Sequence, residues 1–222
     1  MPIIKRVYRD NVFLIRENTV DQYILYESGC YEKLCHFEAD DVWLDAGGHI
    51  GAFCIRYAPL VHWIYSFEPA PKNLQLLMLN VAENDVQNIT IAPQAVIGGE
   101  DHIRDFYLNV KKNTASNSLH IYRGRSMMQV SCTNINTIIE ELGITKMKID
   151  IEGEEVAVLK AVTKENWKQI KEVIFEYHPQ TLRDHDGSQY TELVEYMKKI
   201  FNHVMAPEKK KQRYLLVHCM KV

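Results

Sequence analysis

The stretch from Val42 to Gly51 (VWLDAGGHIG) constrains the fold of this chain more than any other segment. An apolar run ends in an acid and a cluster of glycines, and residues 52–58 then have the composition of a helix start. The pattern predicts a buried strand, a tight loop and a helix. In an open α/β sheet, such a loop lets the backbone and the helix N-terminus approach a ligand closely. The segment therefore predicts a site for a nucleotide-like ligand.

Strand and helix patterns alternate along the chain after this segment. Further strands are expected at 62–68, 89–96, 104–110, 128–132, 147–151, 171–178, 203–205 and 214–218, and helices at 72–82, 135–142, 154–162 and 189–201. The alternation is typical of parallel β-α-β units with right-handed crossovers. We therefore expect an α/β fold, with a mostly parallel twisted sheet, helices on both faces and an antiparallel last strand.

Residues 1–40 have a different pattern. Runs with β propensity at 7–15 and 20–26, separated by a turn-like segment, predict a small N-terminal hairpin cap. A length of 222 residues suits one globular domain. We expect the cap to belong to the same domain as the Rossmann-like unit at 41–222.

Composition and charge disfavour several classes of function. The formal net charge of -3 gives no general attraction to nucleic acid or to an anionic membrane. The five cysteines form no C-x-x-C pair and have no histidines at zinc spacing, which predicts reduced, mostly buried thiols. No window approaches the about 20 apolar residues of a membrane span. We expect a soluble, cytoplasmic protein without a nucleic-acid partner.

Four acids stand at the ends of predicted strands, at Asp45, Glu68, Asp150 and Glu176. The carboxyl ends of parallel strands lie along one edge of a sheet, so these acids should gather in one cleft. Glu68 is suited to accept hydrogen bonds from both ribose hydroxyls of an adenosine ligand. Asp45 would repel a pyrophosphate but attract the ammonium of a methionine moiety. The two acids favour S-adenosylmethionine over NAD, although the loop differs at only one position from the dinucleotide-binding motif G-x-G-x-x-G.

Five motifs between about Val42 and Pro179 resemble those of the FkbM-type methyltransferases, in that family's order and spacing. They are DAGGHIG at 45–51, FEPAPKNL at 67–74, QAVIG at 94–98, KIDIEGEEVxVLK at 148–160 and FEYHP at 175–179. The resemblance implies a class I, Rossmann-like fold. It also implies methyl transfer from S-adenosylmethionine to a hydroxyl, often on a sugar.

The resemblance further implies which residues hold the cofactor. They are Asp45, Gly47 and Gly51 at the methionine end, Glu68 with the adjoining Pro69 at the ribose, and Ala95 with Val96 at the adenine. His49 departs from the family pattern, in which this position is usually Asn. We expect His49 to remain part of the cofactor loop, with contacts altered by its titratable ring.

Methyl transfer requires orientation of the two reactants and a base that takes the hydroxyl proton. Asp150, Glu152 and His178 are the predicted catalytic residues. Asp150, Glu176 and His178 also offer two carboxylates and an imidazole from adjacent strand ends. Such a set is suited to Mg²⁺ or Mn²⁺, which would acidify the acceptor hydroxyl.

The polar loop between the strands at 104–110 and 128–132 is the predicted substrate-binding segment. Asn113, Ser116 and Ser118 are expected to hydrogen-bond sugar hydroxyls, and Tyr122 to stack on a sugar face. A basic segment at 123–125 allows an anionic acceptor as the second choice. Two rival functions stay open at this point, an NAD-dependent oxidoreductase and a catalytically inactive binding module.

Overall fold

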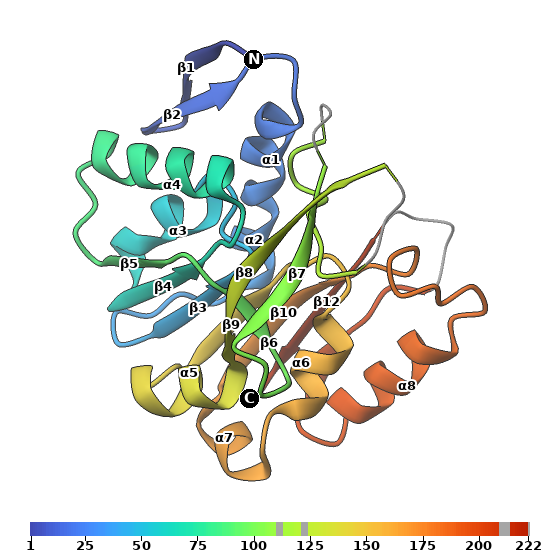
Figure 1. Ribbon diagram of the computed structural model, residues 1–222. Helices are drawn as coiled ribbons and strands as arrows, with labels where there is room; N and C mark the ends of the chain where they lie inside the picture. The colour runs from blue at the N-terminus through green and yellow to red at the C-terminus, as the bar shows by residue number, and fades with distance from the viewer. Residues whose placement is uncertain (110–112, 121–123, 209–213, 222) are drawn as a thin grey trace.

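The computed structural model describes residues 1–109, 113–120, 124–208 and 214–221 (Figure 1). Its centre is a seven-stranded sheet in the order β11-β12-β10-β9-β3-β4-β5. The strands are β3 (Val42–Ala46), β4 (Trp63–Phe67), β5 (Ile89–Ala92), β9 (Lys146–Ile149), β10 (Glu172–Tyr177), β11 (His203–Met205) and β12 (Leu215–Met220). Within this sheet, β5, β4, β3, β9 and β10 pair in parallel, and β12 is antiparallel to both of its neighbours. The predicted fold class is confirmed, including the antiparallel last strand.

The strand order reverses between β3 and β9. From β3 the chain builds outward through β4 and β5, and from β9 it builds in the other direction through β10 and β12. A crevice forms at the carboxyl ends of the strands at such a switch point, and ligands of open α/β sheets bind there. The glycine loop after β3 therefore lies at the centre of the binding edge.

Helices cover both faces of this sheet (Figure 1). They are α3 (Ala52–Tyr57), α4 (Pro71–Glu83), α5 (Ile135–Leu142), α6 (Glu155–Ala161), α7 (Lys164–Gln169) and α8 (Ser188–Met197). On β3, Trp43 joins the apolar core under α3 and α4, while Leu44 joins the core under α5 to α8. Side chains of a strand alternate between the two faces, so an apolar run such as this one is buried on both sides.

The N-terminal segment is a hairpin followed by helices. Strands β1 (Ile3–Tyr8) and β2 (Asn11–Arg16) pair antiparallel, and α1 (Asp21–Glu27), η1 (Ser28–Cys30) and α2 (Tyr31–Leu34) follow. The strand expected at 20–26 is therefore wrong. Asp21 and Leu25, one helical turn apart, are both buried there, so packing overrides the β propensity of the run. The hairpin lies over α4, whose Asn80 and Asn84 side chains accept hydrogen bonds from β2.

A second, three-stranded sheet has the order β6-β8-β7. Its strands are β6 (Ala95–Ile97), β7 (Ile103–Leu108) and β8 (Ser126–Asn134). The single strand expected at 89–96 is thus divided between two sheets. Pro93, which has no N–H to donate, lies at the break. The connection from β7 to β8 contains residues 113–119, which we call the strap.

Among the described residues, no helix combines the length and the apolar character that crossing a membrane requires.

Candidate active site

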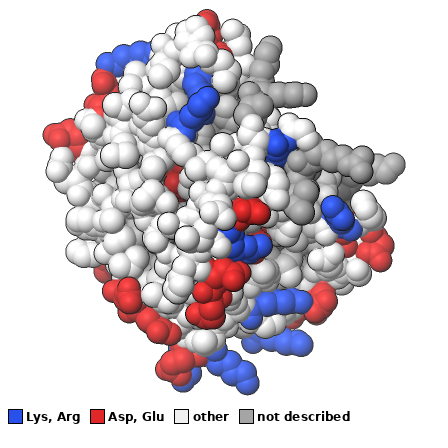
Figure 2. All heavy atoms as spheres, in the orientation of Figure 1, with Lys and Arg blue, Asp and Glu red and all other residues white. Residues whose placement is uncertain are grey.

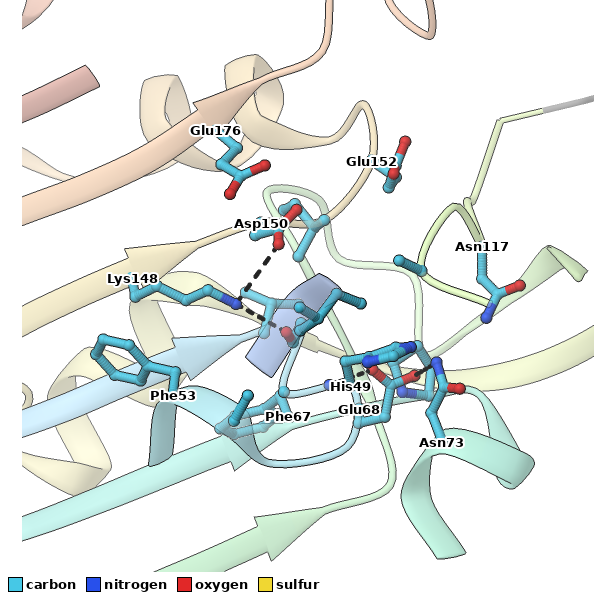
Figure 3. A pocket seen from close by; sticks show the side chains of 18 of the residues that line it. His49, Phe53, Phe67, Glu68, Asn73, Asn117, Lys148, Asp150, Glu152 and Glu176 are labelled. Atoms are coloured by element: carbon cyan, nitrogen blue, oxygen red, sulfur yellow. Dashed lines mark hydrogen bonds and ion pairs between the residues drawn. The ribbon is translucent and has the colours of Figure 1, made fainter. Parts of the chain in front are cut away.

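A cavity of about 390 Å³ opens at the carboxyl ends of β3, β4, β9 and β10 (Figure 3). Its volume lies in the range typical of small-molecule sites. Figure 3 shows Asp150, Glu152 and Glu176 on one side of it, and His49, Glu68, Asn73 and Asn117 on the other. We call these two groups the acid end and the Glu68 end.

The glycine loop forms one wall of the cavity. Gly47 has a φ of +84°, and a Cβ atom on it would lie 1.9 Å from the carbonyl oxygen of Asp150. Only glycine allows this backbone conformation together with such close approach of the loop to the end of β9. Gly51, with a φ of +89°, begins α3 and packs against Ile55 and Leu77 instead of lining the cavity.

Asp45 is fully buried and lies behind the cavity wall. Its Oδ1 atom is 3.1 Å from Nζ of Lys148, which also donates a hydrogen bond to the Gly47 carbonyl at 2.8 Å. Burial lowers the pKa of Lys148, but the carboxylates of Asp45 and Asp150 outweigh it, so that pKa is raised overall. Lys148 is therefore a cation, and it lines the cavity where the sequence predicted Asp45.

Glu68, at the end of β4, is buried at the other end of the cavity. Its two carboxylate oxygens accept hydrogen bonds from the backbone N–H groups of His49 and Ala70, both at 2.8 Å. Burial outweighs these hydrogen bonds and raises the pKa of Glu68 to about 7. Oε2 keeps a lone pair for a further donor, and the second donor at Oε1 is only the Asn73 amide at 3.5 Å, so both oxygens are suited to the adjacent hydroxyls of a ribose.

The predicted adenine contacts lie beside this carboxylate. Ala95 and Val96, in β6, line the cavity together with Phe106 and Leu119, and the adjoining Pro69 lines it as well. These side chains form an apolar wall, which suits the faces of an aromatic base.

His49 has a φ of +49°, a conformation that Asn, Asp and His adopt more readily than other side chains. Its ring lies in a buried cluster, with Nε2 3.2 Å from the Thr114 hydroxyl and 3.7 Å from Asp21 Oδ1. Arg16 binds the same carboxylate through Nε at 2.8 Å. Burial lowers the pKa of His49 to about 4, so the ring is neutral at pH 7. The cluster joins the N-terminal segment, the glycine loop and the strap.

At the acid end, four carboxylates surround His178. Nδ1 of the ring is 2.6 Å from Glu155, and Nε2 is 3.8 Å from Asp150, 3.8 Å from Glu152 and 3.9 Å from Glu176. Burial lowers the pKa of His178, but the carboxylates of Glu155 and Glu152 raise it well above its ordinary value. Burial and the neighbouring Asp150 raise the pKa of Glu176. The structure thus brings together all the predicted catalytic residues.

The predicted metal ligands also meet at this end. One ligand atom each of Asp150, Glu176 and His178 lies within 4.8 Å of the others. Glu155 accepts from Nδ1 and so directs Nε2 toward the carboxylates. A carboxylate in this position is typical of metal-binding histidines. The donor set fits a divalent cation.

The strap covers the cavity with alternate residues. Asn113, Ala115, Asn117 and Leu119 line it, whereas Thr114, Ser116 and Ser118 are buried on the other side. Ser118 donates to the Glu152 carbonyl at 2.6 Å, and Ser116 accepts from Asn109 at 2.9 Å. Of the predicted substrate residues, Asn113 therefore faces the cavity, and the two serines anchor the strap. Tyr122 and Arg123 lie outside the described residues.

Several residues of the site were not predicted from the sequence, namely Lys148, Glu155, Asn73 and Asn117. A signal existed for Lys148, because a charged residue inside the apolar run MKI requires a buried partner. Glu155 stands in the GEE motif, but its contact with His178 depends on how α6 meets β10. Asn73 donates to the Thr114 carbonyl of the strap, a contact between segments distant in sequence. Asn117 donates to the same carbonyl from within the strap, whose path over the cavity no local pattern predicts.

The chain is similar to known methyltransferases in sequence and in fold. Methyltransferase sdnD of Sordaria araneosa is 23% identical over 195 residues, covering 72% of this chain and 74% of that protein. The crystal structure of methyltransferase FkbM from Methylobacillus flagellatus matches with a TM-score of 0.54 at 14% identity, covering 92% of this chain and 55% of that one. A methyltransferase from Streptococcus mutans, solved in complex with SAH, matches with a TM-score of 0.54 at 10% identity, covering 90% and 97%.

The family model described as "Methyltransferase FkbM domain" matches residues 45–208, which include the glycine loop, Glu68 and the acid end. The fold is that of class I methyltransferases. The chain therefore belongs to the FkbM methyltransferase family.

Proposed function

We propose that this enzyme transfers the methyl group of S-adenosylmethionine to a hydroxyl group of a sugar or glycan. One observation carries the proposal, namely that a single cavity has the buried Glu68 carboxylate at one end and a histidine among carboxylates at the other. The first suits an adenosine ligand, and the second suits deprotonation of an acceptor. The Streptococcus mutans methyltransferase, which has a similar fold, was solved in complex with SAH, and this supports S-adenosylmethionine as the methyl donor.

The residues of the cavity fit the proposed cofactor. Glu68 would accept from the ribose hydroxyls, and Ala95 with Val96 would contact the adenine. Lys148 and the Gly47 backbone would hold the methionine end, with Asp45 fixing Lys148 from behind at 3.1 Å. This differs from direct pairing of Asp45 with the methionine ammonium, because Asp45 does not line the cavity.

Bound S-adenosylmethionine supplies an electrophilic methyl group on a positively charged sulfur. The protein then has two tasks, to orient the acceptor oxygen in line with that methyl group and to accept the hydroxyl proton. The raised pKa of His178 makes its ring a poor proton acceptor at neutral pH, and a metal ion bound at Nε2 would occupy the one ring nitrogen that Glu155 leaves free. We therefore assign the proton to Glu152, whose Oε1 lies 3.8 Å from that nitrogen.

We further propose that Asp150, Glu176 and His178 hold Mg²⁺ or Mn²⁺. Two mutually repelling carboxylates and an imidazole oriented by Glu155 support this site. When bound, such an ion would lower the pKa of the acceptor hydroxyl. Oxygen-rich donor sets with one imidazole are compatible with either metal.

A small acceptor fits this site better than a nucleic acid. On the face drawn in Figure 2, acidic and basic side chains are interspersed, with no broad basic surface of the kind that binds phosphate backbones. The family assignment also favours methyl transfer over NAD chemistry.

We propose that residues 1–40 belong to the same domain as the rest of the chain, since Phe13 and Ile15 pack in the core that contains Trp43. Five free thiols support a reducing compartment.

A methyl-uptake assay tests the proposed function. The protein would be incubated with methyl-labelled S-adenosylmethionine and a panel of mono- and oligosaccharides, and the products would be identified by mass spectrometry and NMR. Label on a sugar oxygen would support the proposal, and Asp150→Asn should abolish it. If the protein binds the cofactor but labels no member of the panel, the sugar acceptor is excluded. A catalytically inactive binding module then remains as the alternative.

A further inference from the structure

Four side chains that no motif singled out form a wall next to the acid end. They are Tyr23 and Glu27 of α1, Tyr31 of α2 and Tyr214, which precedes β12. All four line the cavity. We call them the tyrosine wall. Because α1 and α2 lie outside the matched family segment at 45–208, most of this wall is a feature of the N-terminal segment.

The tyrosine wall adjoins the groups that would handle the acceptor. The Tyr214 ring lies 6.2 Å from the His178 ring, and its hydroxyl donates a hydrogen bond to the Glu27 carboxylate. The Tyr31 hydroxyl is 3.4 Å from Glu176 Oε1. Tyr23 is 61% exposed and forms the outer rim. A group bound against this wall would therefore be part of the acceptor, not of the cofactor at the Glu68 end.

Charge in the cavity is unbalanced. Among the described lining residues, the acids are Glu27, Glu68, Asp150, Glu152 and Glu176, and the cations are Lys148 and His178. Each of these cations already has an acid behind it, since Lys148 pairs with Asp45 and His178 with Glu155. In the described part of the chain, Glu27 has no ion-pair partner, and Tyr214 offers it only a neutral donor. The wall thus combines a carboxylate with aromatic rings.

We propose, building on the methyl transfer proposed above, that the acceptor carries a protonated amino group next to the methylated hydroxyl, as an amino sugar does. The Glu27 carboxylate would bind the ammonium, and the rings of Tyr31 and Tyr214 would contact it and the sugar face. Ammonium groups bind both to carboxylates and to the faces of aromatic rings. An anionic acceptor is disfavoured, because the Arg125 side chain lies 3.4 Å from Ser116 and does not line the cavity.

Matched sugars test the charge preference. Glucosamine, glucose and glucuronic acid would be titrated into the protein saturated with S-adenosylhomocysteine, and their dissociation constants compared. A charge-assisted contact predicts that glucosamine binds about 10-fold more tightly than glucose, and glucuronic acid more weakly than both. Equal binding of glucosamine and glucose, tighter binding of glucuronic acid, or no binding of glucosamine would overturn the proposal.

Glu27→Gln tests the assigned residue. The amide retains an acceptor for the Tyr214 hydroxyl but removes the charge, so glucosamine should lose most of its 10-fold advantage while glucose binds as before. Glu141→Gln, at an exposed acid of α5, is the matched control and should leave all three constants unchanged. An undiminished glucosamine preference in Glu27→Gln would contradict the role of Glu27.

Two readouts separate this proposal from the proposed function. The affinity of each variant for S-adenosylhomocysteine should equal that of the wild type. If the wild type itself did not bind S-adenosylhomocysteine, the methyltransferase function would be refuted. NMR of a methylated glucosamine product would locate the methyl group. Methyl on nitrogen would refute both the hydroxyl acceptor and the bound ammonium, because a protonated amino group has no lone pair with which to attack the methyl group.

Discussion

Glu155 Oε1 lies 2.6 Å from Nδ1 of His178, and the side chains of both residues are at most 5% exposed. Glu155 also accepts from the Gly153 backbone N–H through both oxygens, at 3.0 Å each, which fixes the carboxylate. The His178 ring is therefore held in one orientation by a residue that does not itself line the cavity.

This contact predicts the effect of Glu155→Gln. The amide would remove the charge that holds Nδ1 protonated, so we expect turnover to fall about 10- to 100-fold, as for other residues that orient a metal-binding histidine. The affinity for S-adenosylhomocysteine should not change. The control is Glu165→Gln, at an exposed acid of α7. An unaltered pH-rate profile in Glu155→Gln would argue against the positioning role.

Removal of divalent metal should stop methyl transfer while the cofactor still binds. We expect EDTA to abolish turnover, Mg²⁺ or Mn²⁺ to restore it, and His178→Ala to reduce it by about 10² or more. Equilibrium dialysis with Mn²⁺ should give one bound ion in the wild type and none in Asp150→Asn. Full activity in EDTA would exclude the metal site and leave the methyltransferase assignment unaffected.

The buried pair of Lys148 and Asp45 predicts a large loss of stability when the cation alone is removed. Lys148→Met leaves a buried carboxylate without its cation, and the free energy of unfolding should fall by about 3–5 kcal/mol. Adding Asp45→Asn should recover part of this loss, because the uncompensated charge is then removed. Urea denaturation measures both changes. The control Lys160→Met, which removes an exposed ion pair with Glu192, should cost less than about 1 kcal/mol.

If Lys148→Met destabilised the protein no more than Lys160→Met, the pair would not have the structural role assigned to it. If the double variant were less stable than Lys148→Met alone, the loss would come from packing, not from unpaired charge.

His49→Asn should change how stability depends on pH. The pKa of His49 is about 4 in the folded protein, against about 6.5 in the unfolded chain. Between these values only the unfolded chain binds the proton, so the contribution of His49 is complete above pH 6.5 and is lost as pH falls toward 4. Between pH 7.5 and pH 5, the wild type should lose about 2 kcal/mol more than His49→Asn.

Urea unfolding at the two pH values measures this difference. Arg16, Asp21, Thr114, Lys148 and Asp150 surround the ring and are common to both proteins, so their titration cancels in the comparison. Equal losses in the two proteins would show that His49 is not a neutral, buried ring.

The sequence predicted the central sheet and the gathering of strand-end acids because both depend on patterns within single segments. A buried strand such as β3 is an apolar run, and its end is marked by Asp45 and the glycines. The helix α1 was mispredicted, since the buried positions Asp21 and Leu25 are defined by what they pack against. The inward and outward residues of the strap also depend on its path over the cavity, which no local pattern records.

Calorimetric titration of the protein with S-adenosylhomocysteine and with NAD tests the central assignment most directly, with Glu68→Gln as the diagnostic variant. Charge-assisted hydrogen bonds from a ribose to Glu68 are at stake, so at a pH above 7, where Glu68 is ionised, the variant should bind S-adenosylhomocysteine about 10- to 100-fold more weakly. We expect the wild type to bind S-adenosylhomocysteine and not NAD. Binding of NAD alone, or unchanged affinity in Glu68→Gln, would contradict the assignment of this cavity.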